Sequence, residues 1–318
     1  MRPIPWAVTA MRFCCNVSTA WFADAAELRQ EISDYFGSAG TNIELVCTEN
    51  NSDAGAPGKQ STSLVNGLYY ADSLGQLMKT EFNAFVWWDL RNGTDTNGCF
   101  DPELYGWRSY GDLGIINGLN NVDPVFYAAK MMSAFIDAGD QVLAASSDYP
   151  LLSAYAARGK SGELRLLVLH KDPSTNFTAE ISLAGYLPSP AGQTLCYGIL
   201  QDDAARTNAT ASAQDVSTNV VAGLGTNFTY TFAPLSLTLI SFPPAAPSLT
   251  LLPPVPPTSQ VTLELRGQPG VRYVIQSSSD LLAGPWSSIS TNTLASTTLD
   301  LAYPSGQATR YWRAVWQP

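Results

Sequence analysis

The sequence predicts a multidomain protein in which an α/β part is followed by an antiparallel β-sandwich and a small C-terminal β module. Three observations predict this order: helical and strand patterns alternate up to residue 139, apolar residues then recur at every second position, and a Pro-rich segment precedes residue 260. We therefore expect domains over residues 1–139, 140–244 and 260–318, with a stiff, extended linker over 245–259.

The first part alternates amphipathic helices with apolar strands. Asp24, with Glu27 three residues later, predicts a helix that ends at Gly37. Asp123 followed by Pro124 predicts the start of another helix, which ends at Gly139. A third helix is expected between them at about 61–79, and the strands are expected at 43–49 and 83–89. This alternation is typical of a parallel α/β architecture.

The remaining elements are strands separated by Gly, Pro, Asn and Asp turns. This spacing predicts an antiparallel sandwich with strands at 152–158, 163–170, 177–183, 194–200, 227–232 and 235–242. The C-terminal module is expected to contain strands near 260–266, 271–277 and 309–316.

Composition excludes some partners and favours others. The net charge of −10 argues against nucleic acid or an anionic membrane surface as a partner. It is compatible with a neutral saccharide, and the 8 Trp, 14 Tyr and 12 Phe supply rings on which sugars stack, although most of them are expected in cores. The five cysteines form no C-x-x-C pair, so we expect no metal, no cofactor and no disulfide framework. The N-terminal 21 residues show no clean cleavage site, so we expect no signal peptide and predict no localisation.

Two carboxylates follow the two apolar strands of the α/β part. Glu49 ends the run 43–49, and Asp89 ends the run 83–89. If the strands are parallel neighbours, both side chains emerge at the same C-terminal edge, where α/β barrels build their active sites. For Asp89 a loop cap or an ion pair with Arg91 is the competing interpretation, and we favour it over a direct catalytic role. Glu49 has no local cap to form and is therefore the first candidate for chemistry.

Several runs of the sequence resemble a known class of enzymes. The runs 26–32, 43–51, 58–62 and 85–93 resemble the last quarter of the barrel of a retaining (β/α)8 glycoside hydrolase of the α-L-arabinofuranosidase and β-xylosidase type. The segments 154–158 and 166–172 resemble the sandwich that follows that barrel, and 273–278 with 311–313 resemble accessory domains of secreted bacterial enzymes, most of which act outside the cytoplasm.

The resemblance implies roles for individual residues. It makes Glu49 the nucleophile and Trp87 and Trp88 the platform for the sugar. It places Asn50 and Asp89 beside the site. Apart from the resemblance, the long loop at about 90–122, which carries Trp107, is expected to form an ordered lip over the site, and we expect Arg91 and Trp107 to be further substrate contacts. The fold that the resemblance implies is a truncated, partial β/α barrel followed by the sandwich and the small module.

The sequence departs from this family in its length and in its carboxylates. A complete barrel needs roughly 250 residues, and residues 1–139 are too few to supply them. The missing strands would carry the acid/base carboxylate, usually within an Asn-Glu pair, and none precedes Glu49. Retaining hydrolysis needs two carboxyl groups about 5 Å apart.

Three arrangements remain open at this point. Asp89, Glu103 or Asp112 could serve as proton donor, a second copy of the chain could complete the barrel, or the protein could be a non-catalytic carbohydrate-binding or scaffold protein. An incomplete barrel leaves a sheet edge and apolar faces exposed, so we expect a homo-oligomer. An esterase using the same cleft is a further alternative, although no Gly-x-Ser-x-Gly elbow is present and we expect the single histidine, His170, to be structural.

Overall fold

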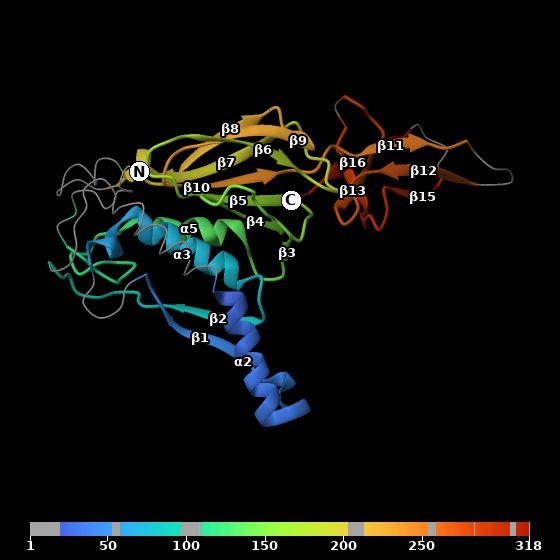
Figure 1. Cartoon of the computed structure of the whole chain (residues 1–318). Helices are drawn as coiled ribbons and strands as arrows, with labels where there is room; N and C mark the ends of the chain where they lie inside the picture. The colour runs from blue at the N-terminus through green and yellow to red at the C-terminus, as the bar shows by residue number, and fades with distance from the viewer. Residues whose placement is uncertain are drawn as a thin grey trace.

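The computed structural model describes residues 20–52, 58–96, 108, 110–202, 213–253, 259–282, 284–305 and 310–317. An α/β part, a β-sandwich and a C-terminal β module follow one another along the chain (Figure 1). The helices are α2 (Trp21–Phe36), α3 (Leu64–Leu77) and α5 (Pro124–Phe135), with short 3-10 helices η1 (Gly37–Asn42) and η2 (Lys59–Thr62). All three predicted helices are present, and α5 begins at the proline predicted for its first turn. Helix α2 begins at Trp21, so Asp24 lies within its first turn and does not cap it, and α5 ends at Phe135, before the predicted end at Gly139.

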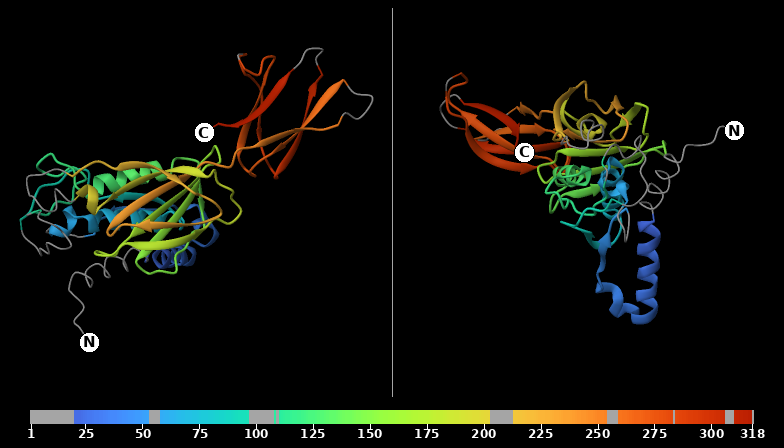
Figure 2. Two further views of the ribbon diagram at one scale, coloured as in Figure 1. Left: turned by 90° about the horizontal axis from the view of Figure 1, so that it is seen from above. Right: turned by 90° about the vertical axis from the view of Figure 1, so that its left-hand side faces the viewer.

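The α/β part contains one pair of parallel strands. Strand β1 (Leu45–Asn50) pairs with β2 (Phe82–Trp87), and no further strand joins them among the described residues. The parallel pairing follows the prediction, whereas the interpretation of this pair as part of a barrel stays a prediction. Helix α2 packs the ring of Trp21 edge-on against Phe82, and Figure 2 shows that α2 projects away from the rest of the molecule.

The sandwich is built on a six-stranded antiparallel sheet in the order β3-β4-β5-β10-β7-β8. A smaller sheet of β6 and β9 covers part of one face. The strands are β3 (Gln141–Leu143), β4 (Leu152–Arg158), β5 (Leu164–His170), β6 (Phe177–Ser182), β7 (Ala191–Gly198), β8 (Ser217–Ala222), β9 (Asn227–Phe232) and β10 (Ser236–Phe242). The predicted antiparallel sandwich is present, but β3 and β8 were not predicted and β7 begins three residues before its predicted start.

Helices cover the other face of the large sheet, so the sheet lies between two cores. Tyr155 and Leu167 point toward α3 and α5, whereas Ala156 and Leu166 point toward β6 and β9. Successive side chains of a strand point to opposite faces, and burial of both faces explains the nearly continuous apolar run of β5.

A buried ion pair fastens α3 to the sheet. The Asp72 carboxylate accepts a hydrogen bond from Lys171 Nζ at 2.6 Å and another from Tyr155 Oη at 2.5 Å. Asp72 is 1% exposed. The helix can approach this closely because residue 75 is a glycine: a Cβ there would lie 2.6 Å from Cζ of Tyr155. Charge pairing and a small residue thus determine how the helical layer sits on the sheet.

The C-terminal module consists of two three-stranded sheets, β11-β12-β15 and β14-β13-β16. Its strands are β11 (Ser248–Leu251), β12 (Gln260–Arg266), β13 (Arg272–Ser278), β14 (Ser287–Thr293), β15 (Thr298–Pro304) and β16 (Tyr311–Trp316). The segment expected to be a linker differs from that expectation, since β11 pairs with β12 and contributes Leu249 to the core. Trp316 Nε1 donates to Ser161 O at 2.9 Å, which joins the module to the sandwich.

Candidate functional site at the end of the parallel strands

Glu49 lies near the C-terminal end of β1 in an irregular stretch of the strand. The register shifts between Cys47, which pairs with Phe85, and Asn50, which pairs with Trp87, so β1 has one more residue than β2 over this interval. Such a bulge bends a strand and redirects its side chains, and bulges are frequent beside active sites. The side chains of Leu45 and Cys47 are buried, while Glu49 is exposed to solvent. The strand therefore presents one accessible carboxylate where it leaves the sheet.

Two asparagines connect the ends of the strands to their surroundings. Asn50 O accepts a hydrogen bond from Trp88 N at 3.0 Å, and Asn50 Nδ2 donates to Tyr69 Oη at 3.2 Å. Asn51 Nδ2 donates to Trp88 O at 2.5 Å and to Leu113 O at 3.2 Å. Asn50 was among the predicted site residues. The role of Asn51 was missed, although it directly follows Glu49 and Asn50 in the sequence.

The two tryptophans occupy different environments. Trp87 is half-buried in an aromatic cluster, with its ring centroid 5.0 Å from that of Tyr70 and 6.4 Å from that of Tyr69. Trp88 is 46% exposed. Only an accessible ring can stack on a ligand, so Trp88 is the residue of the predicted pair that offers a platform.

Asp89 lies directly after this platform, and its backbone is held by the following loop. Its N–H donates to Leu113 O at 3.2 Å and its carbonyl accepts from Ile115 N at 3.0 Å. The Trp88–Asp89 peptide bond is cis. The Oδ1 atom of Asp89 is buried and has no hydrogen-bond partner among the described residues.

The environment of Asp89 favours its protonated form. Burial raises the pKa of the Asp89 carboxyl, and the nearby negative charge of Asp112 raises it further. Asp112 is 1% exposed and accepts hydrogen bonds from Gly114 N at 2.9 Å and Gly118 N at 2.8 Å. A raised pKa extends to higher pH the range in which the Asp89 carboxyl keeps the proton that a general acid donates.

Arg91 does not lie in an ion pair with Asp89 among the described residues. Its guanidinium donates to Asn120 Oδ1, and its backbone forms a bridge with Ile116. The ion pair predicted between Asp89 and Arg91 is therefore not observed among the described residues. Instead, the backbone of Asp89 forms hydrogen bonds with Leu113 and Ile115. Trp107 and the alternative proton donor Glu103 lie outside the described residues, so their predicted roles stay predictions.

A buried charge network attaches the loop after β2 to the sandwich. Arg108 donates to Asp202 Oδ2 at 3.0 Å and lies 3.2 Å from Asp123 Oδ1. Burial raises the pKa of Asp123 to about 6, against the opposing effect of Arg108. The side chains of Arg108, Asp123 and Asp202 are at most 6% exposed, and we interpret the network as structural.

The described residues contain no group of three His, Cys, Asp or Glu side chains that could hold a metal ion. His170 is fully buried, with Nδ1 2.8 Å from Ala233 O, as expected for a structural residue. Within the part of the chain that the structure covers, no helix is long and apolar enough to span a membrane.

Comparisons with known proteins give likenesses of structure only. No family model matches the sequence, and no curated protein matches it. A bifunctional glucanase–xylanase from a metagenome library is similar over 69% of this chain, at 19% identity and a TM-score of 0.45. A Paenibacillus polymyxa xyloglucanase of glycoside hydrolase family 44 is similar over 69% of this chain, at 19% identity and a TM-score of 0.46. A Thermotoga maritima α-L-arabinofuranosidase is similar over 70% of this chain, at 12% identity and a TM-score of 0.47.

The matched structures are much longer than this chain. It covers 34%, 35% and 48% of their respective lengths, which is less than half of each. The matched proteins are glycoside hydrolases of several families, so the likeness specifies no family.

Proposed function

We propose that this protein is glycoside hydrolase-like and that it binds a saccharide at the C-terminal end of β1 and β2. The observation that carries the proposal is the exposed Glu49 carboxylate at the bulge of β1, since the next residue, Asn50, accepts a hydrogen bond from the backbone of the exposed Trp88. An accessible aromatic ring offers an apolar face to a sugar, and a carboxylate is the group that attacks the sugar in retaining hydrolysis. The residue-level resemblance of 43–51 and 85–93 supports the same roles.

In this proposal Glu49 is the nucleophile and Asp89 is the proton donor. Glu49 attacks the anomeric carbon, the bond from that carbon to the leaving oxygen breaks, and Asp89 transfers its proton to this oxygen. Water then hydrolyses the glycosyl ester on Glu49, with Asp89 accepting the proton from that water. The raised pKa of Asp89 supports its role, since the acid must be protonated before the first step.

Covalent trapping tests the assignment of the nucleophile. We expect activated 2-deoxy-2-fluoro arabinofuranosides, xylosides or glucosides to add one glycosyl mass to the peptide that contains Glu49. The fluorine slows both formation and hydrolysis of the ester, while the activated leaving group keeps formation fast enough for the ester to accumulate. Mass spectrometry of the digested protein locates the label. Saccharide binding without any label would favour the non-catalytic binding protein, and a label on another carboxylate would refute the role of Glu49.

The pH profile tests the role of Asp89. Activity should fall as the pH rises through the pKa of Asp89, which is raised, because the proton donor is then lost; D89N should remove this alkaline limb. The loss of rate in D89N should be large for alkyl glycosides and small for dinitrophenyl glycosides, whose leaving groups need no protonation. The control is D34N on the exposed face of α2. An unchanged profile in D89N would exclude Asp89 as the acid.

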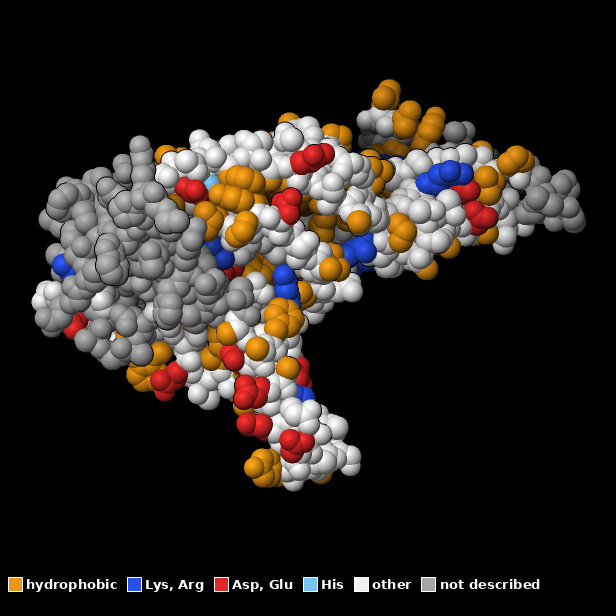
Figure 3. Space-filling model, viewed as in Figure 1, with side chains coloured by type: hydrophobic (Ala, Val, Ile, Leu, Met, Phe, Trp, Pro, Cys, Tyr) orange, Lys and Arg blue, Asp and Glu red, His pale blue; other side chains and the backbone are white. Residues whose placement is uncertain are grey.

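We also propose that a second copy of the chain covers the open face of the β1–β2 sheet. Val46 of β1 is 44% exposed and Val86 of β2 is 48% exposed. Figure 3 shows apolar and acidic side chains together on the projecting part that includes α2, where Tyr35 and Phe36 are exposed. Exposed apolar surface beside unpaired strand edges favours association.

Light scattering measures the expected association. The protein at micromolar concentration should have the mass of a dimer or a larger assembly, and V46K/V86K should shift it toward the monomer because a buried interface does not tolerate unpaired lysines. The matched control is V220K, which changes an exposed valine of β8. A monomeric mass for the unmodified protein would refute this part of the proposal.

A further inference from the structure

The two sheets of the sandwich do not match in width. The large sheet has six strands and the small sheet has two. The Phe228 ring of β9 lies 5.7 Å from that of Phe242 in β10, and the Phe177 ring of β6 lies 6.0 Å from that of His170 in β5. Strand β9 therefore lies over β10 and β6 lies over β5. No described strand lies over β4 and β3, the next two strands of the large sheet.

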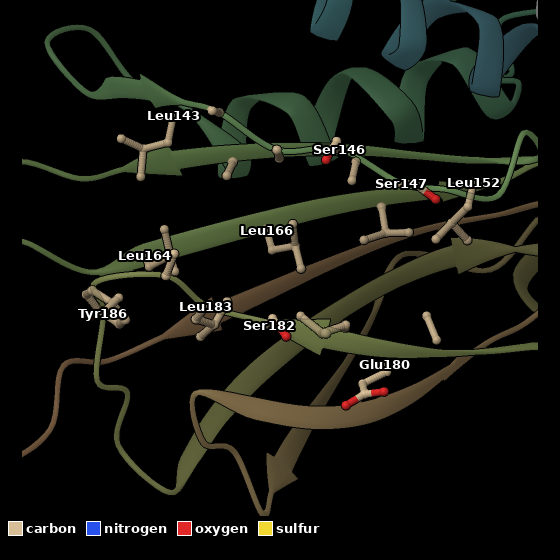
Figure 4. A pocket seen from close by; sticks show the side chains of 18 of the residues that line it. Leu143, Ser146, Ser147, Leu152, Leu164, Leu166, Glu180, Ser182, Leu183 and Tyr186 are labelled. Carbon is tan, nitrogen blue, oxygen red and sulfur yellow. The ribbon is translucent and has the colours of Figure 1, made fainter.

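A groove of about 1390 Å³ lies over β4 and β3, where the small sheet has no strand among the described residues (Figure 4). Its floor is formed by one face of β4 and β5, and its walls by the whole length of β6 and by residues 142–148, at the end of β3 and in the loop that follows. Residues of both faces of β6 line it, among them Ile181, which points inward, and Glu180 and Ser182, which point outward. Because both faces contribute, the groove runs along the edge of β6 and not only beneath it.

The edge of β6 that faces the groove has unused backbone hydrogen-bonding groups. Strand β6 forms its ladder with β9, and no other described strand pairs with it. An unpaired edge of this kind is a template for one more strand. Adjacent strands lie about 4.8 Å apart and stacked sheets about 10 Å apart, so a strand added beside β6 would lie directly over β4.

The floor of the groove selects the side chains of such a strand. Ala154 and Ala156 form its centre on β4, and both are small residues among larger ones. Leu143, Leu183 and Phe177 around them are only partly buried. Small residues in the floor leave room for large apolar side chains at every second position of an added strand. The volume exceeds the range of about 300–1,000 Å³ of typical small-molecule pockets, which favours a chain of several residues.

The charged side chains that line the groove balance one another, with Lys79 and Arg158 against Asp148 and Glu180, and so favour an occupant without net charge. Neither Lys79 nor Arg158 forms an ion pair with a described residue. Among the described residues, Lys79 Nζ donates to Ala145 O at 3.4 Å and lies over the face of the Tyr155 ring. Arg158 donates to Pro269 O, and its Nε is buried without a partner among the described residues.

We propose that this groove binds an extended polypeptide segment with large apolar residues at alternate positions, which adds to the free edge of β6 as a third strand of the small sheet. Backbone hydrogen bonds to β6 would supply affinity, and contacts with the alanines of β4 would supply selectivity. The site lies in the sandwich and is independent of the carboxylates at the ends of β1 and β2, so it does not depend on the proposed glycosidase activity.

A synthetic peptide with the β9 sequence Asn227–Phe232 is a suitable probe, because its antiparallel pairing with the other edge of β6 is known. We expect the fluorescently labelled peptide to bind the full chain in an anisotropy titration and to slow hydrogen exchange of the amides of β6. A peptide N-methylated at alternate residues should bind at least about tenfold more weakly, since it cannot form the ladder. A scrambled peptide without the alternation should also bind more weakly.

Two variants connect the binding to the groove. A154W should abolish binding by filling the floor, whereas V220W, the same type of change on the exposed β8, should leave it unchanged. Circular dichroism checks that both variants are folded. If A154W does not fold, the N-methylated peptide still tests whether binding requires backbone hydrogen bonds to β6. Equal binding of the scrambled or N-methylated peptide would overturn the proposal. Binding of decanoate without protection of β6 amides, or no binding of the peptide, would overturn it as well.

Discussion

Replacing Asp72 by asparagine is expected to lower the free energy of unfolding by about 3–5 kcal/mol. Asp72 is buried and binds both Lys171 Nζ and Tyr155 Oη. The substitution keeps the shape of the side chain but leaves the ammonium group of Lys171 buried without a counter-ion. A buried, unpaired ammonium group destabilises the folded state by more than the loss of one hydrogen bond does, because the group is not hydrated. Urea denaturation followed by circular dichroism measures the change.

An exposed ion pair provides the matched control. Lys130 Nζ lies 2.7 Å from Asp215 Oδ2, with the two side chains 49% and 64% exposed. D215N should therefore cost less than about 1 kcal/mol, although it breaks a contact of nearly the same length. Adding K171M to D72N should recover stability, since it removes the stranded charge. Equal costs for D72N and D215N would contradict the view that burial makes the Asp72 pair strong.

Replacing Glu49 by glutamine is expected to lower turnover of any glycoside that the protein hydrolyses by about a thousandfold or more. In the proposed mechanism the carboxylate forms the covalent bond to the sugar, and an amide of the same shape cannot. Binding of the saccharide should persist, because Trp88 and Asn50 remain in place. Initial rates with aryl arabinofuranosides, xylosides and glucosides, together with calorimetric titration of the corresponding sugars, separate the two effects.

The control for this variant lies in the same segment of the chain. Glu44 is an exposed glutamate just before β1, so E44Q makes the same chemical change away from the strand end and should leave activity unaltered. In E49G, added azide should restore part of the rate by attacking the sugar in place of the carboxylate. Activity that is equal in E49Q and the unmodified protein would remove Glu49 from the mechanism, and activity on acyl esters alone would favour the esterase alternative.

Local sequence patterns predicted most of the elements. Strands β4, β5, β9 and β10 lie within a residue of their predicted limits, because alternating or continuous apolar residues report which faces are buried. Strands β8 and β14 were missed for the opposite reason. They carry many Ser, Thr and Asn residues, and the side chain of Val220 in β8 is 80% exposed, so their pattern does not differ from that of a loop. Strand β15 was also missed, although its partly buried residues alternate with exposed ones.

The candidate site was predicted only in part. Apolar strands that end in Glu49 and Asp89 are visible in the sequence, and β1 and β2 are parallel as expected. The sequence did not predict that Trp87 is half-buried among Tyr69 and Tyr70 while Trp88 is exposed. Both residues are tryptophans, so their type does not show which of the two is covered by a helix. The raised pKa of Asp89 depends on burial and on Asp112, which is distant in the sequence.

The sequence by itself determined the order of the parts, the position of the strand that carries Glu49 and the proline at which α5 begins. These are decided within a few residues, by side-chain periodicity and backbone preference. Only the tertiary structure decided that β10 inserts between β5 and β7, that Asp72 meets Lys171, and that the small sheet stops one strand short over β4. The reason is physical: pairing of strands and burial of charge depend on partners far along the chain, and no local pattern specifies which partner is chosen.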